Sequence, residues 1–106
     1  IKEALRLARE GHHLAKIEVE VENLIDLKEA VGAGADIVML DNMSVSDMQE
    51  AVKIVRSSQK DIILEASGNV SMDNVRAIAT TGVDLISIGA LTHSATAADI
   101  SMKIVR

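Results

Sequence analysis

The chain has 106 residues, of which 48% are hydrophobic and 25% charged, and its formal net charge is -5. This length suits one domain or part of a larger one, and the composition is that of an ordered chain with a buried core. The sequence has no cluster of Lys and Arg of the kind that binds nucleic acid. No stretch is apolar enough to span a membrane. The absence of Cys excludes thiolate metal sites and disulfides. We therefore expect a soluble, cytoplasmic protein.

Along the chain, an amphipathic segment (residues 1–10) is followed by four short apolar runs of the kind that form strands. The runs cover residues 16–21, 36–40, 61–66 and 83–88. Their spacing is typical of repeated βα units, in which each strand is followed by a helix.

The segments between the runs, and the segment after the last one, have the apolar spacing of amphipathic helices. The residues that match this spacing are Leu24, Leu27 and Val31, then Met48, Ala51, Val52 and Val55, and finally Ala97, Ile100 and Ile104. Predicted N-terminal caps are Asn23 and Ser44, the latter with Asp47 three residues later. Predicted stops are the glycines Gly11, Gly34 and Gly82.

Alternating strands and helices predict a parallel sheet, because right-handed crossovers pack each helix back on the sheet. Four βα units fit either part of a barrel or a small doubly wound sheet. No Gly-rich dinucleotide loop follows the first strand, which disfavours the doubly wound alternative. We predict an α/β fold that forms the C-terminal portion of a TIM-like (β/α) barrel.

Acidic side chains gather near the C-terminal ends of the predicted strands, where (β/α) barrels build their active sites. The first strand alternates valines with Glu18, Glu20 and Glu22, which places the carboxylates on one face. Asp41 directly follows the second strand, and Glu65 lies in the third. A solvated edge remains an alternative for the glutamates, and capping of the next turn remains one for Asp41.

The loops after the third and fourth strands have the composition of a phosphate site. Ser67, Gly68 and Asn69 follow the third strand, and Gly89 and His93 follow the fourth. Glycine lets backbone N–H groups approach an anion, and helix N-termini favour negative charge. His93 could instead be a solvated or helix-capping residue.

The predicted site face lacks basic residues. Of 11 Lys and Arg, ten fall in predicted helices, at their ends or in αβ connections, and Lys16 begins a strand at the far end. A face with Glu20, Asp41 and Glu65 therefore needs Mg²⁺ or basic residues from elsewhere to hold an anionic substrate.

Four segments in the same order and spacing resemble quinolinate phosphoribosyltransferases. They are KIEVEVEN (16–23), GADIVMLDN (34–42), EASG (65–68) and TGVDLISIGALTHS (81–94). The resemblance implies transfer of a phosphoribosyl group from phosphoribosyl pyrophosphate to quinolinate, giving nicotinate mononucleotide, pyrophosphate and CO₂ in NAD biosynthesis.

The same resemblance implies roles for seven residues. Glu20 and Asp41 would hold ribose hydroxyls or Mg²⁺ and stabilise positive charge at the anomeric carbon. The 5′-phosphate would be surrounded by Ser67, Gly68, Asn69, Gly89 and His93. It further implies a homodimer or hexamer whose sites are built from two subunits.

The chain departs from the family pattern in two residues and in extent. Asn69 replaces a second Gly, although Asn tolerates a left-handed backbone, and Thr96 stands where Pro is common. Residues 1–106 match only part of the barrel domain, without an N-terminal α/β sandwich, the first barrel strands or the quinolinate-binding basic residues. Alternatives are a non-catalytic or engineered half-barrel with a structural role, and a phosphate-binding barrel of different chemistry.

Overall fold

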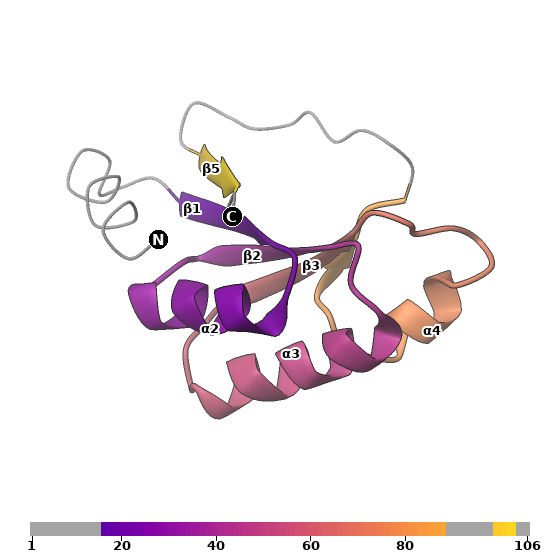
Figure 1. Cartoon of the computed structure of the whole chain (residues 1–106), viewed down its shortest axis with the longest axis horizontal. Helices are drawn as coiled ribbons and strands as arrows, with labels where there is room; N and C mark the ends of the chain where they lie inside the picture. The colour runs from indigo at the N-terminus through magenta and orange to yellow at the C-terminus, as the bar shows by residue number, and fades with distance from the viewer. Residues whose placement is uncertain (1–15, 89–98, 104–106) are drawn as a thin grey trace.

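The computed structural model describes residues 16–88 and 99–103, which form a parallel sheet with helices on one face (Figure 1). The strands are β1 (Lys16–Val21), β2 (Ile37–Asp41), β3 (Ile63–Ser67), β4 (Leu85–Ile86) and β5 (Asp99–Lys103). The helices are α2 (Leu24–Ala33), α3 (Val45–Ser57) and α4 (Val75–Ala79). None of these helices is long and apolar enough to cross a membrane.

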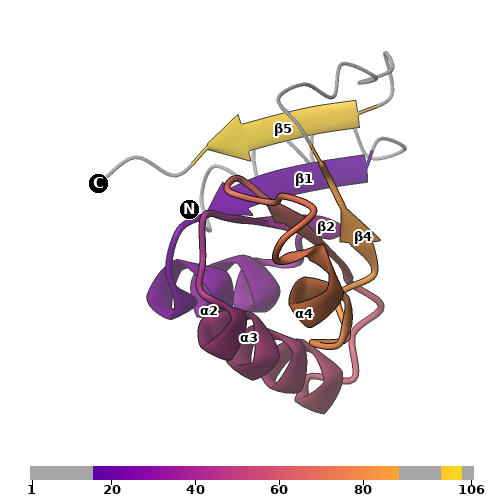
Figure 2. The same ribbon diagram turned by 90° about the vertical axis from the view of Figure 1, so that its right-hand side faces the viewer.

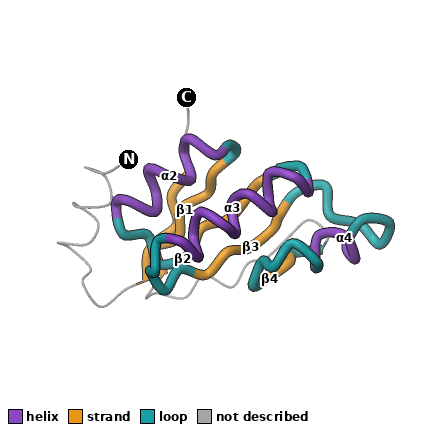
Figure 3. The backbone as a smooth tube through the Cα atoms, turned by 90° about the horizontal axis from the view of Figure 1, so that it is seen from below, coloured by secondary structure: helices purple, strands orange, loops and turns teal. Residues whose placement is uncertain are grey.

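The strand order β4-β3-β2-β1-β5 decides between the two predicted architectures. β1 to β4 follow one another in space as they do in the sequence, and every neighbouring pair is parallel. The connecting helices α2, α3 and α4 all cover the same face, as Figure 3 shows from the helix side. A doubly wound sheet would have helices on both faces. The predicted βα barrel portion is therefore confirmed.

β5 corrects one prediction. Residues 99–103 form a strand, although Ala97, Ile100 and Ile104 predicted a helix. β5 lies parallel to β1, with Asp99 opposite Lys16 (Figure 2). It occupies the edge of β1 where a closed barrel would carry the preceding strand, so pairing satisfies backbone groups of that edge. The segment also alternates polar and apolar residues, so its local pattern suits a strand as well as a helix.

The core lies between the sheet and its helices. Alternate residues of β1 to β3 and one stripe of α2 and α3 are buried there: Val19, Val21, Val38, Leu40, Leu64, Ala66, Leu27, Ala30, Val31, Met48, Ala51 and Val55. Burying each Val, Leu or Met side chain stabilises the fold by about 1.5–3 kcal/mol. Aliphatic and Met side chains thus build the core of a chain that contains no Phe, Trp or Tyr.

The predicted caps of α2 and α3 are confirmed, whereas α4 ends at Ala79 with Thr80 as its C-cap, before the predicted stop at Gly82. The Asn23 side chain accepts a hydrogen bond from the Asp26 N–H at 2.8 Å, and Ser44 Oγ accepts one from the Asp47 N–H at 3.1 Å. Gly34 ends α2 with a left-handed φ of 88°. Gly11 lies outside the described residues.

Two Gly-x-Asp segments secure the N-terminal ends of the strands, a role that the sequence reasoning missed. Asp36 Oδ2 accepts the Ile17 N–H at 2.7 Å, and Asp84 Oδ2 accepts the Leu64 N–H at 2.8 Å. Asp84 is also 3.1 Å from Arg56. Both strands start one or two residues later than predicted, at Ile37 and Leu85, and each aspartate lies just before its strand. This end of the sheet serves stability.

Candidate active site

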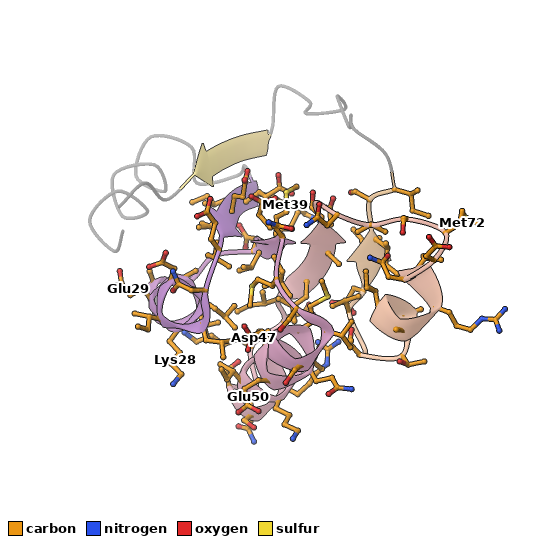
Figure 4. The ribbon with its side chains drawn as sticks, turned by 45° about the vertical axis from the view of Figure 1, so that its right-hand side comes forward. Lys28, Glu29, Met39, Asp47, Glu50 and Met72 are labelled. Carbon is orange, nitrogen blue, oxygen red and sulfur yellow. The ribbon has the colours of Figure 1, made fainter. Side chains whose placement is uncertain are left out.

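The face of the sheet opposite the helices carries the predicted acidic side chains. Glu20 pairs with Met39, Met39 with Glu65, and Glu65 with Leu85, so the four lie in one row across β1 to β4. Residues in register on parallel strands point to the same face, and Figure 4 shows Met39 on the side away from the helices. The alternation predicted for β1 is confirmed, since its valines are buried and Glu18 and Glu20 are partly buried.

Glu65 is held by a partner that the sequence reasoning did not identify. Its side chain is only 9% exposed, and its Oε2 accepts a hydrogen bond from Ser87 Oγ. The Ser87 N–H also donates to Ala66 O at 2.9 Å. Glu65 thus joins the ends of β3 and β4 within this face.

Asp41 and the loop after β3 (residues 67–69, the β3 loop) lie against each other. Asp41 is in register with Ser67, and the Asn42 N–H donates to Ser67 O at 2.8 Å. A Cβ placed on Gly68 would lie 2.8 Å from Asp41 Oδ1 and 3.1 Å from the Asn42 nitrogen. Only glycine fits this approach, since Gly68 also has a φ of 74°.

The capping alternative for Asp41 is not what the structure shows. The N-cap of α3 is Ser44, whose side chain accepts the Asp47 N–H. Asp41 is instead the last residue of β2, partly buried, on the same face as Met39. Its position is therefore that of a side chain available at the C-terminal edge of the sheet.

Asn69 adopts the left-handed backbone that its residue type allows, with a φ of 53°. Its side-chain amide donates to Asn42 Oδ1, and Asn42 is itself left-handed with a φ of 58°. On its other side, Asn69 O accepts a hydrogen bond from Asn74 Nδ2 at 2.6 Å. Asn69 therefore forms the left-handed turn of this loop and adds a contact to the loop after β2.

A pocket of about 370 Å³ lies beside these loops, between the start of α3 and α4. Asn42, Gly68 and Asn69 form part of its lining, and Met48 and Ile78 belong to its apolar side. The second predicted loop cannot be placed against it, because Gly89 and His93 lie outside the described residues.

Glu20 and Asp41, the predicted metal ligands, share one face on adjacent strands. Asp41 lies two residues beyond Met39, the residue opposite Glu20. Within residues 16–88 and 99–103, no three Asp, Glu or His side chains converge as a metal-binding group. Mg²⁺ is usually held by one or two carboxylates together with substrate oxygens and water. Glu20 and Asp41 therefore suit an ion that substrate oxygens and water also hold, and not a metal held by protein ligands alone.

Basic groups lie mainly at the other end of the sheet, as predicted, with one correction. Arg56 donates to Gly82 O at 3.2 Å, and the Lys60 amine donates to Val31 O at 2.7 Å, both at the N-terminal end. Lys103, predicted in a helix, instead lies in β5 opposite Glu20 in the register. One basic residue thus belongs to a strand next to the acidic row.

Comparison with known proteins finds a family match over nearly the whole chain. The family model for "Quinolinate phosphoribosyl transferase, C-terminal domain" matches residues 1–103. A probable nicotinate-nucleotide pyrophosphorylase (carboxylating) of Methanocaldococcus jannaschii is 46% identical over 100% of this chain and 39% of its own length. The solved nicotinate-nucleotide pyrophosphorylase of Francisella tularensis is 46% identical with a TM-score of 0.77, over 84% of this chain and 31% of that one.

A more distant structure supports the fold alone. A thiamine phosphate pyrophosphorylase from Pyrococcus furiosus is 24% identical with a TM-score of 0.69, over 79% of this chain and 43% of that one. The chain spans well under half the length of each of these relatives.

Proposed function

The chain belongs to the quinolinate phosphoribosyl transferase family, matching its C-terminal domain, and we propose that it supplies part of an active site that makes nicotinate mononucleotide. In this reaction the ring nitrogen of quinolinate bonds to the anomeric carbon of phosphoribosyl pyrophosphate as the bond to pyrophosphate breaks. The carboxylate next to the ring nitrogen leaves as CO₂, and a proton takes its place.

The observation that carries the proposal is the contact between Asp41 and the β3 loop. Gly68 approaches Asp41 Oδ1 so closely that no Cβ fits between them. A ribose 5-phosphate group has its phosphate at one end and its anomeric carbon at the other. Its binding site therefore requires a phosphate-binding loop beside a carboxylate. The glycine turn gives backbone N–H groups access to a phosphate, and the carboxylate stabilises developing positive charge on the sugar.

Each candidate residue has one part in this proposal. Asp41 and Glu20 face the sugar and would hold Mg²⁺, which when bound neutralises charge on the departing pyrophosphate. Ser67, Gly68 and Asn69 receive the 5′-phosphate, together with Gly89 and His93 of the second loop. Glu65 is engaged with Ser87, so we assign it to holding the ends of β3 and β4.

Quinolinate needs more cations than the described residues place beside the acidic row. Two carboxylates are best bound by Arg or Lys in fixed geometry, yet Arg56 and Lys60 bind at the opposite end of the sheet. We propose that the rest of a longer cytoplasmic polypeptide and a partner subunit provide them in a homodimer. Light scattering on the protein that carries this chain should give a dimer or a hexamer, and a strict monomer contradicts it.

The activity is tested directly with the protein that carries this chain. Supplied with quinolinate, phosphoribosyl pyrophosphate and Mg²⁺, it should release nicotinate mononucleotide, pyrophosphate and CO₂ in equal amounts. Nicotinate in place of quinolinate serves as the control acceptor, because it lacks the carboxylate that leaves. Absence of product under saturating substrates, with the protein folded by circular dichroism, refutes the proposal.

A further inference from the structure

We infer that Asn42 and Asn69 form a positioning pair that holds the β3 loop at a set distance from Asp41. The inference rests on the proposed function, because it concerns how the same site receives the phosphoribosyl group. Neither asparagine is proposed to react with substrate. Their role is to arrange the loop before the ligand arrives, and for Asn69 this role comes in addition to its proposed place beside the 5′-phosphate.

The pair joins two loops at matching places in the fold. Asn42 follows β2 and Asn69 lies just beyond β3, and both are left-handed, with φ of 58° and 53°. The Asn69 amide donates to Asn42 Oδ1. The Asn42 N–H donates to Ser67 O at 2.8 Å, so Asn42 contacts the β3 loop on both sides of Gly68.

A third asparagine anchors the loop from the other side. Asn74 Nδ2 donates to Asn69 O at 2.6 Å, and its Oδ1 accepts the Ser71 N–H at 2.8 Å. Asn69 is therefore held through its side chain toward β2 and through its carbonyl toward α4. Gly68 lies between Ser67 and Asn69, so both of its neighbours are fixed.

The consequence concerns spacing within the site. The backbone at Gly68 lies so near Asp41 and Asn42 that an added Cβ would be 2.8 Å from Asp41 Oδ1 and 3.1 Å from the Asn42 nitrogen. A phosphate at the β3 loop and a sugar at Asp41 are two ends of one ligand, so their separation must match the ribose. A loop arranged in advance spares the cost of ordering it on binding. Loss of the pair should weaken phosphoribosyl binding and leave quinolinate binding unchanged.

Glycine substitutions test the pair without backbone strain, because glycine tolerates both left-handed positions. The variants are Asn42→Gly, Asn69→Gly and the double variant. Gln59→Gly is the matched control, since exposed Gln59 is also left-handed, with a φ of 59°, and follows α3 at the opposite end of the sheet. It should leave both Michaelis constants unchanged.

We expect each single variant to raise KM for phosphoribosyl pyrophosphate about three- to tenfold, as for one neutral hydrogen bond. KM for quinolinate and kcat should change by less than about twofold. The double variant should resemble the singles, since both remove one interaction. A purely structural role predicts a lower melting temperature without this difference between the two Michaelis constants.

Several outcomes overturn the inference. They are an unchanged KM for phosphoribosyl pyrophosphate, an equal rise in both Michaelis constants, and multiplicative effects in the double variant. If the wild-type protein makes no product, the proposed function fails and calorimetry with ribose 5-phosphate tests the pair alone. Weaker binding by Asn69→Gly then supports the inference, whereas equal affinity, or no binding by the wild type, refutes it.

Discussion

Gly68 contacts Asp41 so closely that a Cβ on the glycine would lie 2.8 Å from the carboxylate oxygen Oδ1. The contact joins the ends of two neighbouring strands, β2 and β3. The backbone of the β3 loop and the side chain of Asp41 therefore belong to one surface.

Gly68→Ala should therefore damage both folding and binding. A side chain at a φ of 74° costs about 1–2 kcal/mol, and the new methyl group displaces Asp41 or the loop. We expect urea denaturation to show a loss of about 1–3 kcal/mol and kinetics to show a higher KM for phosphoribosyl pyrophosphate.

The control is Gly32→Ala in α2, where a Cβ meets nothing within 4 Å. That change should stabilise the protein by about 0.5–1 kcal/mol. A Gly68→Ala protein as stable and active as the wild type contradicts the observed contact.

Asp41→Asn should lower kcat by at least about tenfold with little change in stability, because stabilising charge on the reacting sugar is worth more than the partly buried Asp41 carboxylate contributes to folding. Steady-state kinetics and urea denaturation measure the two effects. Asp47→Asn, at the exposed start of α3, is the matched control and should retain full turnover. Equal kcat for Asp41→Asn and the wild type removes Asp41 from the proposed chemistry.

Asp84→Ala should cost more stability than Arg56→Ala. Replacing Asp84 leaves the Leu64 N–H without its partner at 2.8 Å, which costs about 1–3 kcal/mol. The Arg56–Asp84 ion pair is 49% and 37% exposed, and such pairs contribute about 0–1 kcal/mol. Chemical denaturation of both variants measures the two losses of stability. An equal loss would show that the ion pair, and not the bond to the Leu64 N–H, stabilises this end of the sheet.

An anion should bind at the β3 loop. In a crystal grown with sulfate or phosphate, we expect density beside residues 67–69. The control in solution is a phosphate titration of Gly68→Ala that is monitored through amide chemical shifts. Anion binding only at the end of the sheet near Asp36 and Asp84 would contradict this location.

The 106-residue chain on its own should show no measurable phosphoribosyl transfer. Among the described residues, Lys103 is the lysine in register with the acidic row, a single lysine cannot hold both carboxylates of quinolinate, and Mg²⁺ could serve only the pyrophosphate. Among the described residues β4 and β5 are the outer strands of the sheet, and we expect their edges to make the chain self-associate. The test compares its nicotinate mononucleotide formation with that of the longer polypeptide. Rates within about tenfold, or ~1.4 kcal/mol in activation free energy, would contradict an incomplete site.

Local patterns in the sequence were enough to predict the βα alternation, the caps and the location of the acidic face. Asn23 and Ser44 accept N–H groups three residues away, and the β1 glutamates alternate with buried valines. These features depend on backbone geometry over a few residues, so the sequence alone determines them. The parallel sheet followed because a right-handed crossover leaves few other arrangements.

The remaining features depend on which distant segments meet. The Asn42–Asn69 bond spans 27 residues and the Ser87–Glu65 bond 22, and both exist only because strand register brings those loop ends together. Residues 99–103 suit a helix and a strand alike, and pairing with the free edge of β1 selects the strand. Local preferences differ by less than about 1 kcal/mol per residue, so unsatisfied backbone groups on an open edge outweigh them. The sequence by itself therefore determined the elements from β1 to β4 and the face that bears the site, whereas only the tertiary structure decided that residues 99–103 form a strand and which loops contact one another.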